Sequence, residues 1–179
     1  MAFDFEPARF IPFRDREACA RVRAIRRADL VNHPNPDFHV RVIEDADHFF
    51  VSFALDLVGR IRAAAEEGRH FVVILPAGPM VQYDHAAAII NRLRIPLGHV
   101  HSFNMDEFAD HEGQSAPAEW PGSFQYAMWR RFFGRIDEDL RPPLSQIHFP
   151  SSANVADYGR RIADLGGADV CYGGIGWCG

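Results

Sequence analysis

The chain has 179 residues, of which 47% are hydrophobic, 24% charged and 12% aromatic, so it can build a core and whole-chain disorder is excluded. The formal net charge of -5 gives no basic surface for a nucleic-acid backbone, and we expect no nucleic-acid partner. All 19 basic residues are Arg, which excludes a Schiff base on a lysine of this chain.

The cysteines indicate the cellular setting. Cys19, Cys171 and Cys178 are odd in number and far apart, which favours reduced thiols over a disulfide framework. The N-terminus has no basic region followed by an apolar run, and no stretch reaches the roughly 18 apolar residues of a membrane span. We therefore expect a cytoplasmic protein with no membrane partner.

Residues 1–38 are predicted to be an accessory segment ahead of the main domain. An arginine-studded helix is expected over 14–30, and we interpret its charged face as a solvated or docking surface. The run from Asn32 to Pro36 holds two prolines and cannot continue a helix, so the compact domain is predicted to span 39–179.

Helices and strands alternate within that domain. Strands are predicted at 40–43, 71–75, 99–103, 144–149 and 168–172, and helices from the Asp45 cap to Gly68, then at about 80–93, 123–133 and 154–165. This alternation predicts a Rossmann-like, doubly wound α/β fold, with a mostly parallel sheet and helices on both faces. The uninterrupted connection over 105–121 is long enough to be a binding loop or lid.

Three strand ends are expected to meet at one edge of this sheet, where open α/β folds bind ligands. They are Pro76–Pro79, Asn104–Glu107 and the glycine-rich Gly173–Gly179. Ala77, Gly78 and Pro79 lead into a helix whose free N–H groups could hold a phosphate, although a plain tight turn remains the alternative.

Asp106 and Glu107 suit proton transfer beside a carbonyl or imine, because a partly desolvated carboxylate can reach a C–H bond there. The alternative is that both are solvated loop acids, and the convergence of the three strand ends favours the catalytic interpretation. Cys178 is a weak candidate nucleophile because no paired base is evident.

A metal site is not predicted. His99 and His101 are two residues apart on a predicted strand and so should share a face, with Asp110, His111 and Glu112 nearby. No spacing among these residues resembles a closed zinc motif, so core or supporting histidines are the favoured interpretation.

Four segments resemble the glucosamine-6-phosphate deaminase/isomerase family in order and spacing: Leu75–Met80, Phe103–Phe108, the 123–133 helix ending Arg-Phe-Phe, and Gly173–Gly176. The resemblance spans about residues 40–179 and implies a domain that binds an aminosugar phosphate without a metal or organic cofactor. It implies that Asp106 moves a proton between C2 and C1 before ammonia is lost. Taken together, the predicted site residues are Asp106, Glu107 and Cys178 for catalysis, and Ala77, Gly78, Pro79, Asn104, Gly174, Gly176 and Trp177 for substrate binding.

The chain departs from the family pattern in three places. The Ala77–Pro79 loop is about two residues shorter than the family's phosphate loop and carries no hydroxyl. Trp177 and Cys178 stand where the family has Asn and Asp, and the chain stops at Gly179, where a His follows in the family. The expectation is therefore the first part of a longer protein, with the fold incomplete at its C-terminal part and one sheet edge exposed.

Two other functions remain open. The same fold serves as a non-catalytic sugar-phosphate sensor in some transcription regulators, although no helix-turn-helix precedes the domain here. A 6-phosphogluconolactonase-like hydrolase is the second alternative, and it requires a basic group above the lactone that the sequence does not reveal. The expected partner in every case is a small-molecule sugar phosphate, and homo-oligomerisation is left open.

Overall fold

A computed structural model describes residues 15–174, which divide into two compact units, one up to Glu44 and one over Asp45–Gly174. The first unit contains α1 (Arg16–Arg23), capped by the Asp15 side chain, and a short 3-10 helix at Arg27–Asp29. The single helix expected over 14–30 is thus wrong beyond Arg23. Because α1 buries no side chain, no packing stabilises a longer helix here.

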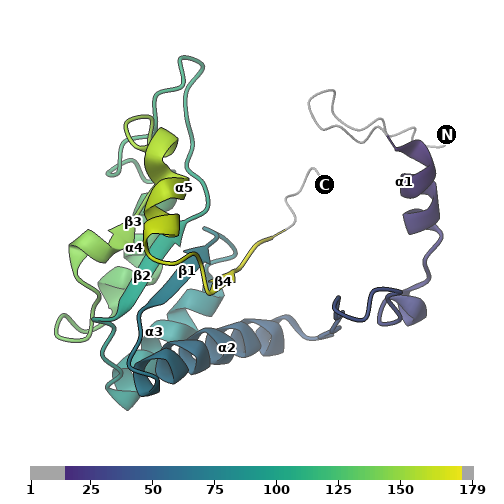
Figure 1. Cartoon of the computed structure of the whole chain (residues 1–179), viewed down its shortest axis with the longest axis horizontal. Coiled ribbons are helices and arrows are strands. Elements are labelled where there is room, and N and C mark those ends of the chain that lie inside the picture. The colour runs from purple at the N-terminus through teal and green to yellow at the C-terminus, as the bar shows by residue number, and fades with distance from the viewer. Residues whose placement is uncertain (1–14, 175–179) are drawn as a thin grey trace. The chain divides into compact units, whose positions relative to one another are not determined.

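The second unit holds a four-stranded parallel sheet in the order β3-β2-β1-β4 (Figure 1). Its strands are β1 (Phe71–Leu75), β2 (Val100–Asn104), β3 (Ile147–His148) and β4 (Val170–Cys171). β1 and β2 pair along their full lengths, from Phe71 beside Val100 to Leu75 beside Asn104. The predicted parallel arrangement of these strands is confirmed.

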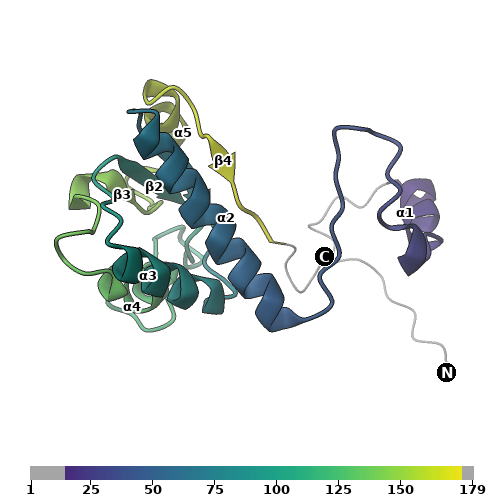
Figure 2. The same ribbon diagram turned by 90° about the horizontal axis from the view of Figure 1, so that it is seen from below.

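Helices lie on both faces of this sheet, as the doubly wound prediction requires (Figures 1 and 2). They are α2 (Ala46–Glu66), α3 (Val81–Leu93), α4 (Phe124–Arg131) and α5 (Val155–Asp164). Phe71, Val73 and Leu75 point into one hydrophobic core with α2, α3 and Met128 of α4. The fold class predicted from the alternating pattern is therefore confirmed.

On the opposite face, α5 packs through Tyr158, whose ring meets Phe103 edge-on at a centroid distance of 5.4 Å. The Tyr158 hydroxyl lies 3.0 Å from the carbonyl oxygen of Asn104 and 2.9 Å from that of His148. One side chain therefore joins the ends of β2 and β3. Within residues 15–174, none of the helices has the length and apolar character needed to cross a membrane.

Three predicted strands differ from the structure. Residues 40–43 form no strand, since β1, β2, β3 and β4 alone make up the described sheet and such a short run has no neighbour to pair with. Residues 144–146 form a 3-10 helix, which follows Pro142 and Pro143, and only Ile147–His148 pair with β2. The strand expected over 168–172 pairs only at Val170 and Cys171.

Candidate active site

The carboxyl ends of β1, β2 and β4 lie side by side, as the sequence predicted. The Met105 amide donates to the Leu75 carbonyl at 2.9 Å, and the Tyr172 amide donates to the Ile74 carbonyl at 3.0 Å. A Cβ built on Gly173 would lie 3.5 Å from the Met105 methyl group. The loops after these strands therefore border one region at the edge of the sheet.

The loop after β1 leads into the N-terminus of α3. Gly78 has φ +137°, a conformation that favours glycine, and open space surrounds its Cβ position. The Tyr83 hydroxyl donates to the Pro76 carbonyl at 2.6 Å, and full burial raises the pKa of this phenol well above its usual value. Met80 supplies no side-chain cap to α3. The Tyr83 amide donates to the Met80 carbonyl at 3.1 Å. The first amides of any α-helix point towards the segment before it, which is the arrangement an anion site requires.

Two buried polar groups near this helix end lack partners. One is the side-chain amide nitrogen (Nδ2) of Asn104, at the end of β2. The other is the side-chain oxygen (Oε1) of Gln82, in the first turn of α3. Neither atom makes a hydrogen bond within the described residues. Asn104 is 1% exposed and Gln82 is 2% exposed. An unpaired buried donor such as that of Asn104 is costly.

Asp106 is the exposed acid at the end of β2. Within residues 15–174 its carboxylate has no hydrogen-bond or ion-pair partner. Partial desolvation raises the pKa of this carboxyl, and the neighbouring negative charge of Glu107 raises it further. Both effects destabilise the ionised form of the carboxyl relative to its protonated form, so the carboxylate is a better proton acceptor than that of an ordinary exposed aspartate.

Glu107 has a different environment from Asp106. Its Oε1 accepts the Phe108 and Phe124 amides at 2.9 Å each, and its Oε2 accepts the Gln125 amide at 2.9 Å. Phe124 and Gln125 begin α4, so the carboxylate binds a helix N-terminus. The structure therefore separates two acids that the sequence had placed together in a catalytic role.

A pocket of about 260 Å³ opens beside these acids, between the loop after β2 and the turn that precedes α5. It is lined by Met105, Asp106, Glu107, Ala109, Gly113, Ser115, Pro150, Ser151, Ser152 and Val155. The Ser152 amide donates to the Ser115 hydroxyl at 2.5 Å, and the Ser115 amide donates to the Ser152 hydroxyl at 3.5 Å. The long loop predicted as a binding loop is therefore fastened to the turn after β3.

Sequence reasoning missed the serines of this pocket. Ser151 and Ser152 follow β3 at the same edge of the sheet as the three predicted loops. Applying the strand-end rule to β3 as well would have found them. By contrast, the predicted residues Gly176, Trp177 and Cys178 lie outside the described residues, and Gly174 is the last residue described at the end of β4.

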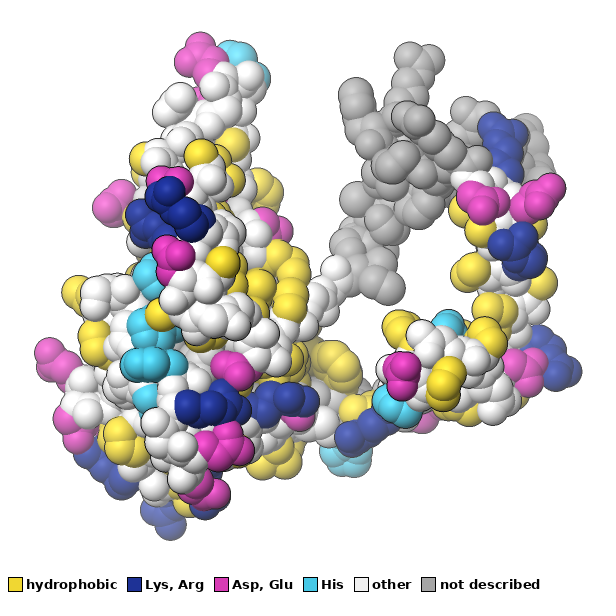
Figure 3. All heavy atoms as spheres, viewed as in Figure 1, with side chains coloured by type: hydrophobic (Ala, Val, Ile, Leu, Met, Phe, Trp, Pro, Cys, Tyr) yellow, Lys and Arg dark blue, Asp and Glu magenta, His cyan; other side chains and the backbone are white. Residues whose placement is uncertain are grey.

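The histidines form no metal-binding group. His99 Nε2 lies 2.9 Å from the Ile61 carbonyl oxygen of α2. The centroid of the His101 ring lies 5.0 Å from that of the His70 ring and 6.4 Å from that of the His148 ring. His99 precedes β2, so the two predicted neighbours have different surroundings. Over residues 15–174, no three His, Cys, Asp or Glu side chains gather as metal ligands. Figure 3 shows histidine side chains gathered on the face of the sheet that carries α5.

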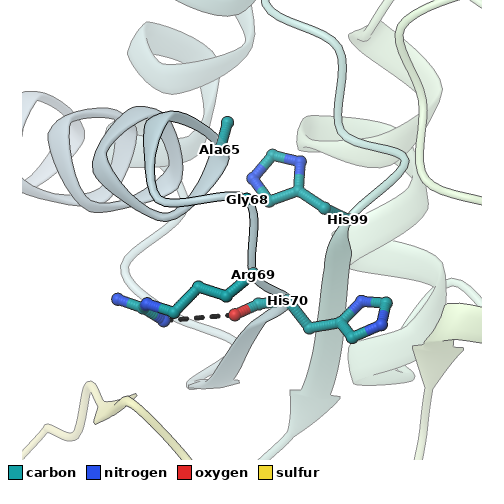
Figure 4. Close-up of a pocket in the computed structure, with 5 residues that line it drawn as sticks. All are labelled: Ala65, Gly68, Arg69, His70 and His99. Carbon is teal, nitrogen blue, oxygen red and sulfur yellow. Dashed lines mark hydrogen bonds between the residues drawn. The ribbon is translucent and has the colours of Figure 1, made fainter.

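A second pocket of about 300 Å³ lies at the opposite end of the sheet, between α2 and the start of β1 (Figure 4). Arg69 contacts Glu67 and Asp169 and also donates to the His70 carbonyl, so its charge is already neutralised. The Arg69 and His70 side chains point away from His99 in Figure 4. The polar groups of this pocket therefore do not converge on a ligand.

Several curated proteins with related sequences are glucosamine-6-phosphate deaminases. The glucosamine-6-phosphate deaminase of Caenorhabditis elegans is 32% identical over 142 residues, which cover 74% of this chain and 49% of that protein. The glucosamine-6-phosphate deaminase of Phocaeicola vulgatus is 31% identical over 144 residues, covering 76% and 53%. The chain thus spans about half the length of the curated relatives it matches. No family model matches the chain.

Solved structures agree in fold. A monomeric glucosamine-6-phosphate deaminase superposes with a TM-score of 0.59 at 19% identity, covering 71% of this chain and 51% of that one. The 6-phosphogluconolactonase of Thermotoga maritima superposes with a TM-score of 0.51 at 20% identity, covering 69% and 53%. The sequence relatives confirm the resemblance noted from the motifs, and the structures confirm the fold.

Proposed function

Because the chain is homologous to glucosamine-6-phosphate deaminases over about three quarters of its length, we propose that it provides the substrate-binding and proton-transfer part of an aminosugar-phosphate isomerase/deaminase. The reaction converts glucosamine-6-phosphate, or a related sugar phosphate, into a ketose phosphate and ammonia. The observation that carries the proposal is Asp106, an acid without a partner in the described part of the chain, beside a pocket at the sheet edge.

In this mechanism Asp106 is the base. Its carboxylate takes the proton from C2 of the open-chain sugar and returns it to C1. The aldehyde oxygen gains a proton and the C2 ammonium group loses one, so the C1 carbonyl becomes a hydroxyl and the double bond is then between C2 and nitrogen. Water then adds to that imine and ammonia leaves, giving the ketone. The raised pKa of Asp106 favours acceptance of the C2 proton and still allows its return.

The phosphate is held at the N-terminus of α3. Ala77, Gly78 and Pro79 carry no hydroxyl, so backbone amides and the helix dipole supply the attraction. The buried Asn104 side-chain amide, whose nitrogen has no hydrogen-bond partner within residues 15–174, lies at the same end of the sheet. No cofactor takes part in the chemistry proposed, and a cytoplasmic setting accords with a sugar-phosphate substrate.

Proton exchange at C2 tests the proposal. We would incubate the full-length protein with glucosamine-6-phosphate in deuterated buffer and follow loss of the C2 proton signal by NMR. Asp106→Asn should slow exchange by roughly a hundredfold or more, because the base is lost. The control is Glu119→Gln, which neutralises an exposed acid of the same loop and should exchange like wild type.

Exchange that persists in Asp106→Asn would remove Asp106 from the mechanism. Thermal shift with a panel of sugar phosphates and an ammonia-release assay accompany the exchange measurement. A stabilising ligand that is neither exchanged nor deaminated by the wild-type protein would overturn the enzyme proposal in favour of the sensor.

A further inference from the structure

The N-terminus of α4 is bound by a residue that lies far from it in sequence. The Phe124 and Gln125 amides donate to the two carboxylate oxygens of Glu107, 17 and 18 residues earlier. The next amides donate to Ser123, Tyr126 to its hydroxyl at 3.0 Å and Ala127 to its carbonyl at 3.1 Å. The Ala127 bond is the first regular bond of the helix, and the amide of the N-cap residue Ser123 donates to the Trp120 carbonyl at 2.9 Å. The four amides that precede the regular helical bonds, those of Ser123, Phe124, Gln125 and Tyr126, are thus all satisfied, two of them by Glu107.

Asp106 is held between two such contacts. On one side, the Met105 amide is bonded to the Leu75 carbonyl of β1. On the other side, the Glu107 carboxylate is bonded to α4 and also accepts the Phe108 amide. The backbone of Asp106 is therefore fixed at both neighbours, while its own carboxylate is left unpartnered among the described residues.

α4 is in turn tied to the helix that is proposed to bind phosphate. Arg131, the last residue of α4, donates through Nε to Asp84 at 2.9 Å and through its terminal nitrogen to the second Asp84 oxygen. Asp84 lies in the first turn of α3. A continuous series of contacts therefore runs from Glu107 through α4 to the N-terminal turn of α3.

We propose that Glu107 is a positioning residue for the reaction: its carboxylate, bound to the N-terminus of α4, sets where Asp106 stands relative to the N-terminal end of α3, and it transfers no proton itself. This inference rests on the proposed function, since it assigns Asp106 and α3 the roles given above. It assigns Glu107 a different role from the catalytic one expected from the sequence, because three amide donors already occupy both of its oxygens.

The charge of Glu107 adds a second effect. The negative charge raises the pKa of the Asp106 carboxyl, in addition to the larger effect of partial desolvation. Glutamine at position 107 keeps an oxygen that can accept one α4 amide but removes the charge, whereas alanine removes both. The two substitutions therefore separate the contact with α4 from the electrostatic effect on Asp106.

Amide hydrogen exchange in the full chain tests the contact with α4. In Glu107→Ala the Phe124 and Gln125 amides should exchange about tenfold faster or more than in wild type, since bonds to a charged acceptor are lost, and Glu107→Gln should fall between. Ser123→Ala is the matched control, because it removes the cap of Tyr126 and leaves the Glu107 contacts in place. Unchanged protection of Phe124 and Gln125 in Glu107→Ala overturns the proposal.

Carboxyl carbon NMR of Asp106 supplies the readout that loss of structure alone would not give. Glu107→Gln should lower the pKa of Asp106, whereas Glu119→Gln should leave its titration as in wild type. In C2 exchange, Glu107→Ala should lower kcat by about tenfold with KM within about twofold, and Glu107→Gln should recover part of the rate. A Glu107→Gln variant that is as inactive as Asp106→Asn, with Phe124 and Gln125 protected, would make Glu107 catalytic and overturn the inference.

The two proposals fail separately. If Asp106→Asn leaves proton exchange at C2 unchanged, the proposed function is lost. Amide hydrogen exchange in α4 and the titration of Asp106 in the wild-type and Glu107 variants then still decide whether Glu107 fixes this loop. If proton exchange at C2 depends on Asp106 but is unaffected by Glu107→Ala, the positioning inference alone is overturned.

Discussion

Asp106 and Glu107 show how adjacent residues of the same chemical type acquire different surroundings. Their sequence predicts two carboxylates at a strand end, and that placement is confirmed by the structure. The difference in their hydrogen bonding could not be predicted, because the three amides that Glu107 accepts include those of Phe124 and Gln125, which only the folded chain brings near. The catalytic role of Asp106 itself stays a prediction.

Asp106→Asn should stabilise the folded protein at neutral pH. The folded-state pKa of Asp106 is raised, so its stabilising contribution is present below its unfolded pKa of about 3.8 and is lost as pH rises through the folded value. At pH 7 the ionised group therefore lowers the free energy of unfolding, and its removal raises it. Urea denaturation at pH 7 and near pH 4 measures this.

The advantage of Asp106→Asn should shrink as the pH approaches 4. Glu119→Gln, at an exposed position in the same loop, is the comparison, and it should leave the free energy of unfolding unchanged at both pH values. A destabilised Asp106→Asn at pH 7 would show that the aspartate makes favourable contacts.

At the scale of elements, the central strands match their predicted bounds closely, whereas the outer strands lie within the predicted ranges but are shorter. Phe71–Leu75 is an unbroken apolar run, and the structure gives β1 the same bounds. β2 lies within one residue of the prediction. Residues 144–149 share the apolar composition of a strand, but Pro142 and Pro143 precede them and only two residues pair. The apolar composition of a segment predicts that it is buried. Whether it pairs as a strand depends on the neighbouring strand, which the segment's own sequence does not reveal.

The histidines on β2 and β3 should make the protein less stable in mild acid. Burial lowers the pKa of His101, as does the nearby His70, and burial lowers that of His148, with smaller effects from His101 and Arg161. Since their unfolded pKa is about 6.5, the stability present above that pH is lost as the pH falls from about 6.5 through the lower folded values. The free energy of unfolding, measured by urea at pH 7, 6 and 5, should decline.

Single substitutions identify the groups responsible. His148→Gln and His101→Gln should each make the acid-side decline shallower. His111→Gln is the control, because that side chain is 90% exposed in the loop after β2. A decline that is equally steep in all three variants would assign the pH dependence to other residues.

At the scale of the whole molecule, the hydrophobic core found among residues 15–174 lies in the second unit. The core residues run from Ala54 to Leu140, with partly buried neighbours from Phe53 to Tyr172. The sequence predicted a boundary at residue 38, where two prolines interrupt the chain, while the compact unit begins at Asp45. The difference arises because residues 40–43 are apolar enough to suggest a strand but find no strand to pair with.

Deleting residues 1–44 should leave the core intact. We expect the thermal midpoint, measured by circular dichroism, to stay within about 3 °C of the full chain, the shift that roughly 1 kcal/mol produces in a domain of this size. A variant lacking residues 1–14 alone serves as the comparison. A fall of the midpoint by much more in the longer deletion would show that residues 15–44 contribute to the stability of the second unit.

The Tyr158 hydroxyl lies within hydrogen-bonding distance of two carbonyls, those of Asn104 and His148, but it has one hydrogen to share. These carbonyls stand where the pairing between β2 and β3 runs out. Beyond the last paired residues, no hydrogen bond of the described sheet joins β2 to β3. Tyr158 of α5 therefore limits how far the two strands can separate there. The width of the pocket beside Asp106 therefore depends on the position of α5 against the sheet. A substitution that shifts α5 should change the width of the pocket even when no residue that lines it is altered.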